Sequence, residues 1–480
     1  MKSTSAWKPI FNLNYCFFLL FFFSSALSSE IVIDGYLSEE EWKTAREINK
    51  FYEVFPFSLN DASGDTRILI QEDEKGIYIG FINIQAKETI RANQHQRDQG
   101  ARPPVGDQVG ITIDFDNDGK TGYRFSVNAG NSINDGTVIN ENEQNMDWDG
   151  DWLSATSIAD TGWFAEIFIP WTITSMKSQK GEERTVGFCF YRMLLSEYKV
   201  SATCRGSPYV NKFLSVFDEM NFKQYEVSKL DFFPYITISD DSVTEEQNTK
   251  TGAEIFWKID SSKQLNATFN PDFGQVESDE LVVNFSATET YYSDKRPFFA
   301  ENQSMFEVQG YQMFYVINTR RIGGAPDYNC PSFSSNLASS CSTNQKGTSD
   351  IDLAIRYIQQ SETLDFGFLG ASEKDEDFSQ GRDFYATKFR KTSKNFSFGY
   401  LGTHVERPVL NREATVHTTD FEYWASEDLR VSGVLINSKV NDKDGYGFRV
   451  GYGYTPSKTF SGGMGVWYFD EKIDLSDMGY

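Results

Sequence analysis

Histidine is scarce in this sequence, which contains only His95, His404 and His417 in 480 residues. A G-x-S-x-G elbow, a phosphate-binding loop and a dinucleotide-binding fingerprint are also missing. Hydrolysis by a Ser–His–Asp triad and nucleotide-dependent chemistry therefore have no support. Glycosidases need two carboxylates at a defined separation, but the 69 acidic residues offer no basis for selecting a pair. The sequence alone identifies no catalytic residue.

Long apolar runs are confined to the N-terminus. Lys2 and Lys8 precede the apolar run CFFLLFFF at 16–23, and the small residues SSALSS follow it. A basic start, a short apolar segment and a small-residue cleavage site are typical of a signal peptide. We therefore expect residues 1–28 to be removed after Ser28 and the protein to be exported. No later segment has 18 consecutive apolar residues, which excludes a helical membrane protein but not a membrane β-barrel.

Positive charge is also scarce, because 45 Lys and Arg residues stand against 69 Asp and Glu residues. Cleavage would remove Lys2 and Lys8 and give a net charge of 43 − 69 = −26. A chain this acidic repels nucleic acid, so we expect no nucleic-acid partner. Neutral ligands and cations remain compatible with this charge.

Four cysteines remain after the expected cleavage: Cys189, Cys204, Cys330 and Cys341. An even number in an exported protein indicates disulfides, and the spacing does not fit a zinc site. Three connectivities are possible. We predict the two local pairs, Cys189–Cys204 and Cys330–Cys341, which would each close a short loop.

Short segments of strand character fill residues 30–225. Turn residues separate TRILIQED, GIYIGFINI, VGITIDF, YRFSVNA, GWFAEIFIPW and RTVGFCFYRMLL. One helix signal stands apart, SEEEWKTAREI, with Ser38 at the capping position and Glu41 three residues later. Many short strands with Gly and Asp turns predict a β-sandwich.

Residues 228–480 have a different pattern, in which aromatic residues alternate with small or polar ones. In GYGFRVGYGYT, residues 445–455, one face carries Tyr446, Phe448, Val450, Tyr452 and Tyr454. AEIFWKI, IDLAIRYI, LDFGFLGA, FSFGYLGT and GMGVWYF alternate similarly. In an exported chain, this repetition predicts an antiparallel outer-membrane β-barrel with lipid against its aromatic face. The predicted fold class is all-β throughout.

The stretch DQVGITIDFDNDGKTGYRFSVNAGN begins like an EF-hand loop at Asp114, Asp116 and Asp118. The twelfth position from Asp114 is Phe125 instead of Glu, and strand-like segments stand where an EF-hand needs helices. We therefore expect a β-hairpin with its tip at DNDGKTG. Two interpretations of the three carboxylates remain open: an ordinary turn, or a Ca²⁺ site of modest affinity completed by water.

Two sets of motifs resemble known families. IDGYLSEEEW at 33–42, DQVGITIDFDNDGKTGYRFSVNAG at 107–130 and GWFAEIFIPW at 162–171 are similar to a carbohydrate-binding module of family 9. FNPDFGQVESDELVVNFSATETYYSDKRPFFAENQSMF, at 269–306, and the later NTRRIGG resemble the uncharacterised DUF5916 family. Members of that family join such a module to an outer-membrane β-barrel. The resemblance implies carbohydrate binding, in some relatives with hydrolysis of O-glycosyl bonds and carbohydrate catabolism.

Sugar recognition needs aromatic faces together with polar groups that bind hydroxyls. Trp148 and Trp152 lie among acids in NMDWDGDW, where we expect a loop and not a core. Arg124 and Asn128 alternate along YRFSVN, on the face opposite its apolar residues. These four residues are the predicted carbohydrate-binding residues, although solvent exposure alone also explains Arg124 and Asn128.

Together these patterns predict an outer-membrane protein with a periplasmic sandwich, 30–225, followed by a barrel region, 228–480. Its predicted role is to bind a glycan or assist its uptake or breakdown. Two alternatives remain, a glycoside hydrolase and a structural envelope barrel without ligand. Near the C-terminus, Asp474 and Ser476 occupy positions where a closing barrel strand needs apolar residues. We therefore expect the barrel to be incomplete in this sequence.

Overall fold

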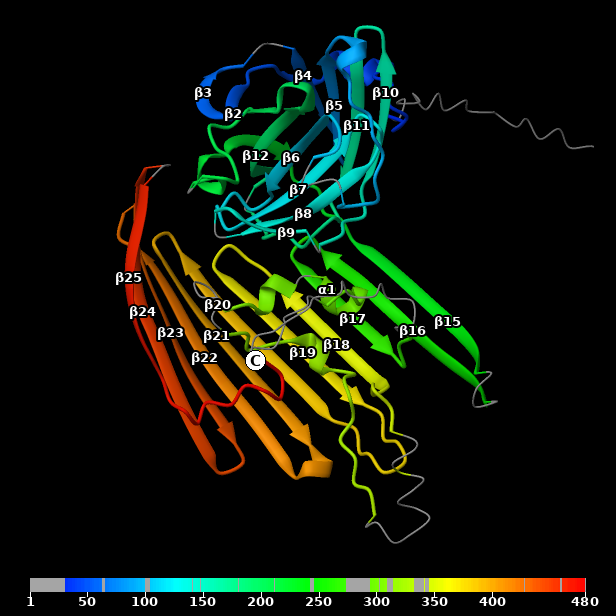
Figure 1. The fold of residues 1–480 in the computed structure, drawn as a ribbon, viewed down its shortest axis with the longest axis vertical. Helices are drawn as coiled ribbons and strands as arrows, with labels where there is room; N and C mark the ends of the chain where they lie inside the picture. The colour runs from blue at the N-terminus through cyan, green and yellow to red at the C-terminus, as the bar shows by residue number, and fades with distance from the viewer. Residues whose placement is uncertain are drawn as a thin grey trace, which may run out of the picture.

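The computed structural model describes residues 31–479. Gaps in this description fall at 63–64, 100–103, 140, 147, 180, 211, 242–245, 273–293, 302, 309–313, 332–340, 342–344, 427 and 458–459. The predicted signal peptide and part of the DUF5916-like motif lie outside the described residues. Most of the described elements are strands in antiparallel sheets and the helices are all short, which confirms the all-β class. Figure 1 shows a compact upper unit, β1–β14, above a curved lower sheet, β15–β25.

The upper unit contains two sheets. The first has the order β1 (Arg46–Ile48), β4 (Thr66–Glu72), β5 (Gly76–Ile84), β11 (Gly162–Pro170), β10 (Leu153–Ala159). The second has the order β3 (Phe57–Asp61), β2 (Tyr52–Phe55), β13 (Lys199–Ala202), β12 (Glu183–Leu194), β6 (Gln108–Asp114), β7 (Thr121–Asn128), β8 (Ile133–Ile139), β9 (Glu143–Asn145). Strand β14 (Asp218–Lys223) also pairs with β12.

Alternation along the strands builds the core between these sheets. On β7, Phe125 and Val127 are fully buried and pack against Ile111 of β6 and Trp163 of β11. Arg124, which lies between the apolar positions, projects from the opposite face of the sheet. Short 3₁₀ helices connect the strands: η1 (Glu40–Thr44), η2 (Lys87–Thr89), η3 (Leu195–Glu197) and η4 (Leu214–Val216). The helix predicted from Ser38 is therefore only the short η1, which buries Trp42.

The lower sheet contains eleven strands in sequence order. They are β15 (Lys229–Asp241), β16 (Glu246–Asp260), β17 (Lys263–Phe269), β18 (Ile351–Gln359), β19 (Leu364–Glu373), β20 (Asp383–Ser393), β21 (Phe396–Arg407), β22 (Arg412–Trp424), β23 (Leu429–Val440), β24 (Lys443–Ser457) and β25 (Phe460–Phe469). In the described part of the chain, β15 and β25 do not pair with each other, so this sheet is open.

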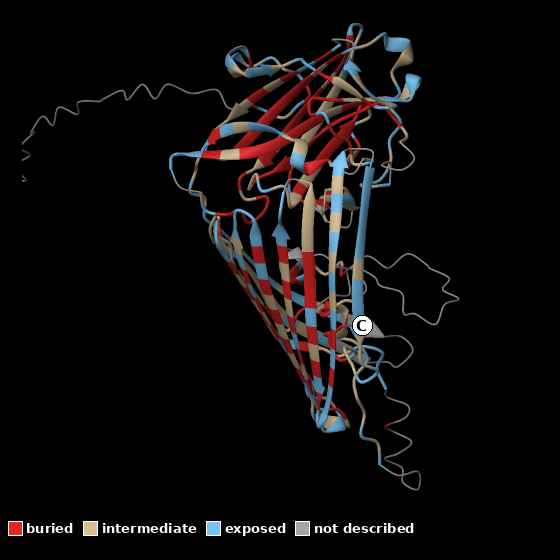
Figure 2. Ribbon diagram, turned by 90° about the vertical axis from the view of Figure 1, so that its left-hand side faces the viewer, coloured by how far each residue is buried: buried red, intermediate tan, exposed pale blue. Residues whose placement is uncertain are grey.

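The two faces of the lower sheet differ in chemistry. On β24, Tyr446, Phe448, Val450, Tyr452 and Tyr454 are exposed, as the alternation predicts. Figure 2 shows exposed and buried residues alternating along these strands. The outward face therefore carries rows of aromatic and aliphatic side chains without a covering layer in the described part of the chain.

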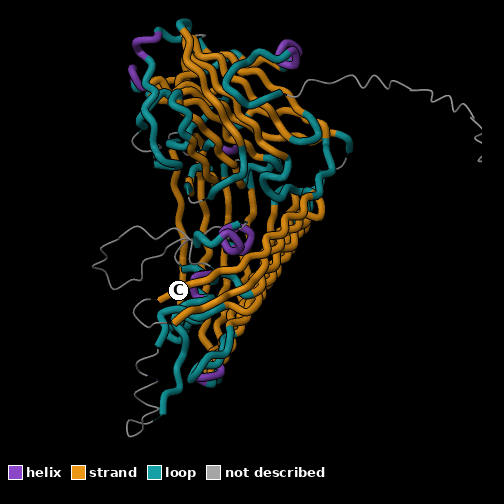
Figure 3. The backbone as a smooth tube through the Cα atoms, turned by 90° about the vertical axis from the view of Figure 1, so that its right-hand side faces the viewer, coloured by secondary structure: helices purple, strands orange, loops and turns teal. Residues whose placement is uncertain are grey.

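The concave face is covered by chain segments. These are α1 (Pro297–Ala300), η5 (Gln303–Phe306), η6 (Thr319–Arg321) and the C-terminal segment after β25. Figure 3 shows the strands curving around these helices. Phe298 and Met478 from this cover pack on Leu369 and Leu401 of the sheet. No helix in the described residues is long and apolar enough to cross a membrane.

The upper unit sits on one end of the lower sheet. The backbone N–H of Met176 donates to the carbonyl of Ser261, 2.7 Å away, in the β16–β17 turn. Lys212 pairs with Asp428 at 2.8 Å in the β22–β23 turn. The strand turns at this end of the lower sheet thus contact the sandwich.

Both predicted disulfides are confirmed. Cys189 and Cys204 are bridged with their Cα atoms 5.1 Å apart, and Cys330 and Cys341 with theirs 5.7 Å apart. The first bridge joins the middle of β12 to the segment after β13, so it fixes the loop that borders the site described next.

Candidate functional site

An aromatic pocket opens on the outer face of the second sheet. Its volume is about 340 Å³, and its walls and floor come from β2, β6, β7, β12, β13 and the segment 198–213. Three aromatic side chains at its rim are exposed to solvent: Phe55 at 36%, Tyr198 at 55% and Tyr209 at 63%. The Phe55 ring centroid lies 5.6 Å from that of Tyr198 and 6.3 Å from that of Tyr209. Such rings offer flat apolar faces beside solvent.

Local turns hold the two tyrosines at the rim. Tyr198 follows η3 in the left-handed region, with φ of 52°, and its N–H donates to the carbonyl of Leu195. Tyr209 lies in a turn in which the N–H of Val210 donates to the carbonyl of Ser207. The Cys189–Cys204 bridge ties the intervening chain to β12. The rim therefore stands on constrained backbone.

Polar groups line the pocket floor. Gln108 and Thr112 of β6 and Arg124 of β7 alternate with core residues and so point outward into the pocket. The guanidinium of Arg124 stacks on Tyr191, with its Cζ 4.9 Å from the ring centroid. Arg124 also donates from Nη2 to the Tyr191 hydroxyl at 2.8 Å. Aromatic walls around a polar floor are what a small polar ligand with apolar faces requires.

Arg124 is the predicted binding residue that the structure places in this pocket. Asn128, on the same strand face, is 1% exposed, and its side chain bonds to other residues of the protein. Its side-chain amide donates to the carbonyl of Asn93, and its oxygen accepts from the N–H groups of Gly130 and Ser132. These bonds tie the loop after β7 to the connection before β6, so Asn128 has no exposed group to offer a ligand.

The expectation that Trp148 and Trp152 stay out of the core is wrong. Trp152 is 6% exposed, and its indole packs against Phe125 with ring centroids 5.5 Å apart. Trp148 is half-buried against Tyr123, 5.0 Å away. The acidic neighbours Asp149 and Asp151 are tolerated because their side chains are 65% and 93% exposed to solvent. The indole N–H of Trp152 donates to Asp135 of β8. Trp152 therefore has no open face for stacking on a sugar, while sugar binding by the half-buried Trp148 stays a prediction.

The Asp114 hairpin forms as predicted, since β6 pairs with β7. Asp114 accepts hydrogen bonds from the N–H groups of Asp116 and Gly119 within the turn. The ammonium of Lys177 lies 2.5 Å from Asp118, and the Lys177 N–H donates to Asp116. Although burial alone would lower the pKa of Lys177, Asp118 and Asp116 raise it.

A protein cation therefore lies beside the carboxylates of the predicted Ca²⁺ site. Arg184 lies 3.6 Å from Asp116, which adds a second positive charge to the cluster. Calcium binding at Asp114, Asp116 and Asp118 stays a prediction, and it requires displacement of the Lys177 ammonium. The geometry favours the turn interpretation of these residues.

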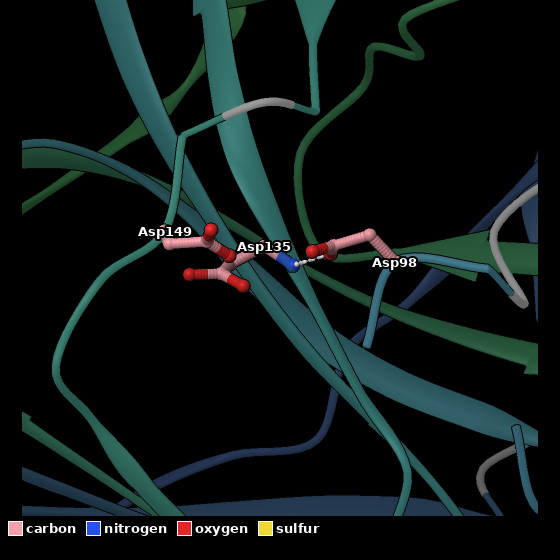
Figure 4. A group of neighbouring side chains, drawn as sticks. All are labelled: Asp98, Asp135 and Asp149. Atoms are coloured by element: carbon pink, nitrogen blue, oxygen red, sulfur yellow. Dashed lines mark hydrogen bonds between the residues drawn. The ribbon is translucent and has the colours of Figure 1, made fainter. Parts of the chain in front are cut away.

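A second acidic group includes Asp135 of β8, which pairs with Phe125 of β7. Oxygens of Asp98, Asp135 and Asp149 lie within 4.8 Å of one another (Figure 4). Arg97 lies among them, with nitrogen–oxygen distances of 2.6 Å to Asp135 and 2.8 Å to Asp149. The N–H of Asp135 also donates to Asp98. Through these contacts Arg97 links β8 to the loop that carries Trp148 and Trp152.

A larger cavity of about 720 Å³ lies where the sandwich meets the lower sheet. Charged side chains from both units line it and pair with each other. Lys212 pairs with Asp428, and Arg430 lies 3.4 Å from Glu422. The cavity thus belongs to the junction between the two units.

A buried carboxylate on β11 predicts how stability responds to pH. Glu166 is 0% exposed, and burial raises its pKa to about 7, although the N–H groups of Asp34 and Gly35 donate to it. Because the folded-state pKa is higher than the ordinary value of 4.5, folding is penalised as Glu166 ionises. Stability should fall between about pH 4.5 and pH 7, by roughly 1–3 kcal/mol from this group.

The measurement is calorimetry of the wild-type chain and Glu166→Gln at pH 5 and pH 8. We expect a smaller loss of melting temperature in the variant, because glutamine does not ionise. Glu183→Gln, at the exposed start of β12, is the control and should keep the wild-type pH dependence. An equal loss in Glu166→Gln and wild type would contradict the assignment.

Sequence reasoning missed Phe55, Tyr198 and Tyr209. Their signal was weak, because SEYK and GSPY are ordinary turn sequences until the fold brings them together. The tyrosines flank Cys204 in the chain, and the Cys189–Cys204 bridge places that segment over the β12 face. The predicted Cys189–Cys204 disulfide, taken together with the tyrosines on either side of Cys204, is the sequence signal that could have identified the rim.

Twelve chains of solved structures match this chain, and two of them, both of low sequence identity, are described here. One is a loop-deletion mutant of OmpT, an outer membrane protein of Vibrio cholerae, with 10% identity and a TM-score of 0.21, covering 51% of this chain and 94% of that one. The other is an anion-selective porin from Comamonas acidovorans, with 8% identity and a TM-score of 0.25, covering 75% of this chain and 88% of that one. Neither score is high enough to support an argument. No curated protein matches the chain.

Family models match both units. Residues 33–193 match the carbohydrate family 9 binding domain-like model, and residues 227–354 match the model for a domain of unknown function, DUF5916. The first match spans the strands that build the floor of the aromatic pocket, and the second begins just before β15. In these two stretches the chain is thus similar first to the carbohydrate family 9 binding domain-like family and then to the DUF5916 family.

Proposed function

We propose that the sandwich binds carbohydrate in the aromatic pocket and that the lower sheet holds it at the outer membrane. The observation that carries the first part is the exposed rim of Phe55, Tyr198 and Tyr209 over the polar floor of Gln108 and Arg124. Aromatic faces pack against sugar C–H groups, while amide and guanidinium groups bind hydroxyls. The family match of residues 33–193 supports the same ligand class.

The outward face of β15–β25 supports the membrane assignment. Leu435, Tyr452 and Trp467 on its strands are 57%, 47% and 59% exposed, with many similar neighbours. A soluble protein rarely exposes so large a continuous apolar surface. Alternation of outward apolar and inward polar residues on antiparallel strands is the pattern of outer-membrane barrels. The sheet would form part of such a barrel, with lipid as its outward partner.

The strand connections support a periplasmic position for the sandwich. The sandwich sits on the end of the sheet where every connection is short: 261–262, 360–363, 394–395, 425–428 and 458–459. The opposite end includes the long connection 270–350 and the connection 374–382. Outer-membrane barrels have short periplasmic turns and longer extracellular loops. The sandwich would then hold glycans in the periplasm for uptake or breakdown by other proteins.

Rim substitutions test carbohydrate binding. Tyr209→Ala and Tyr198→Ala should each weaken binding of a glycan identified on an array of the full-length chain, by about tenfold, because each removes a stacking face. Tyr36→Ala is the control, since Tyr36 is 62% exposed on the same unit but does not line the pocket. Isothermal titration in detergent measures the three affinities. Equal affinities for all variants and wild type would place binding elsewhere.

A further inference from the structure

The pocket has a charge opposite to that of the protein as a whole. The full sequence has a net charge of −24, yet among described residues the pocket is lined by one arginine and by no Asp or Glu. Arg124 is that arginine, and it makes no ion pair with any described carboxylate. Asp98 acts on it electrostatically from beyond ion-pair distance. A half-buried guanidinium that lines a pocket and has no paired anion is available to bind an anionic ligand.

The donors of Arg124 are only partly used. Its Nε and Nη2 both donate to the Tyr191 hydroxyl, at 3.2 and 2.8 Å, and its Nη1 donates to Gln144 at 3.2 Å. A guanidinium has five N–H donors, so two remain, one on each terminal nitrogen. A carboxylate accepts a pair of this kind in bidentate geometry.

The surrounding contacts fix the orientation of the Arg124 guanidinium. Tyr191 supports the guanidinium face at 4.9 Å and accepts two of its hydrogen bonds. Preorganisation lowers the entropic cost of binding, because the arginine does not need to be ordered by the ligand. The rings of Tyr198 and Tyr209 stand at the rim of the same pocket. A ligand that meets both features combines a carboxylate with a ring that has apolar C–H faces.

We propose that the pocket selects acidic sugars, with Arg124 binding the carboxylate of a uronate while the rim aromatic residues pack on its ring. This inference rests on the proposed carbohydrate binding and adds the class of sugar. Polar uncharged neighbours at the floor, Gln108 and Thr112, would bind ring hydroxyls. Selectivity for acidic over neutral sugars would come from the carboxylate, since a neutral hexose gives the Arg124 guanidinium no anion to pair with.

The test is isothermal titration of the full-length chain in detergent with D-glucuronate and D-glucose, which differ only at carbon 6, and with acetate. Wild type should bind glucuronate at least tenfold more tightly than glucose and bind acetate far more weakly than glucuronate. Arg124→Gln should bring the glucuronate-to-glucose affinity ratio close to one. Arg124→Lys keeps the positive charge but lacks the planar pair of N–H donors, so it should give an intermediate ratio. It also tests the proposal if Arg124→Gln does not fold. Arg67→Gln on β4, outside the pocket, should keep the wild-type ratio.

Each outcome separates this inference from the proposed function. Equal affinity of wild type for glucose and glucuronate would overturn acidic selectivity and leave carbohydrate binding intact. Binding of neither monosaccharide, together with no signal on the glycan array, would overturn both. Acetate binding as tight as glucuronate binding would show a simple anion site and overturn the sugar assignment. A glucuronate preference that survives in Arg124→Gln would remove Arg124 from the explanation.

Discussion

Leu435→Arg is expected to prevent stable assembly of the chain in the outer membrane. Leu435 lies in the middle of β23 on the outward face and is 57% exposed. In a membrane barrel this position contacts lipid, where an arginine near the midplane costs roughly 2–4 kcal/mol. The assembled fraction should fall strongly, as measured by membrane fractionation and by the mobility shift between heated and unheated gel samples.

Leu410→Arg provides the matched control. Leu410 is 50% exposed, but it lies in η7 (Pro408–Leu410), in a connection beyond the strand ends. The substitution should therefore leave assembly close to wild type. If the sheet were exposed to water, both leucines would tolerate arginine equally. Equal behaviour of the two variants would contradict the membrane assignment.

Lys177→Met is expected to open the Asp114 hairpin. The Lys177 ammonium lies 2.5 Å from Asp118 and is largely buried, so its removal leaves the carboxylates of Asp116 and Asp118 poorly compensated. Removal of one partner from a buried ion pair costs roughly 3 kcal/mol or more. Hydrogen exchange of peptides that cover residues 107–131 should accelerate by roughly two orders of magnitude.

An exposed pair serves as the comparison for this result. Lys87 lies 2.7 Å from Asp160, and both side chains are more than half exposed. Lys87→Met should therefore change exchange only slightly, since solvent screens the attraction within an exposed pair. Millimolar Ca²⁺ should restore protection in Lys177→Met if the three carboxylates can serve as ligands. Unchanged exchange in Lys177→Met would show that the ion pair contributes no stability.

Periodicity predicted most of the fold. Strict alternation in GYGFRVGYGYT placed Tyr446 and Tyr452 on the exposed face, because side chains on a strand alternate regardless of its partners. The Cys189–Cys204 bridge followed from short spacing. The helix signal at Ser38 overestimated the local structure, since only the short η1 forms and residues 46–48 pair with β4 as strand β1.

The site was harder to predict because its residues come from separate strands and loops. Arg124 was found because it alternates with buried residues on β7. The polar sequence around Trp148 and Trp152 does not reveal that Trp152 is buried, because the pairing of Asp135 with Arg97 and with the Trp152 indole arises only in the folded chain. Tyr198 and Tyr209 reach the pocket only through the turns and the disulfide after β12. Long-range pairing of this kind has no periodic signature.

The most direct test of carbohydrate binding by the aromatic pocket is an experimental structure of the full-length chain with a bound saccharide. The account predicts a sugar ring in contact with Tyr198 or Tyr209 at the rim, with a polar substituent directed toward Arg124. A saccharide bound instead beside Trp148, or in the cavity between the sandwich and the lower sheet, would contradict it.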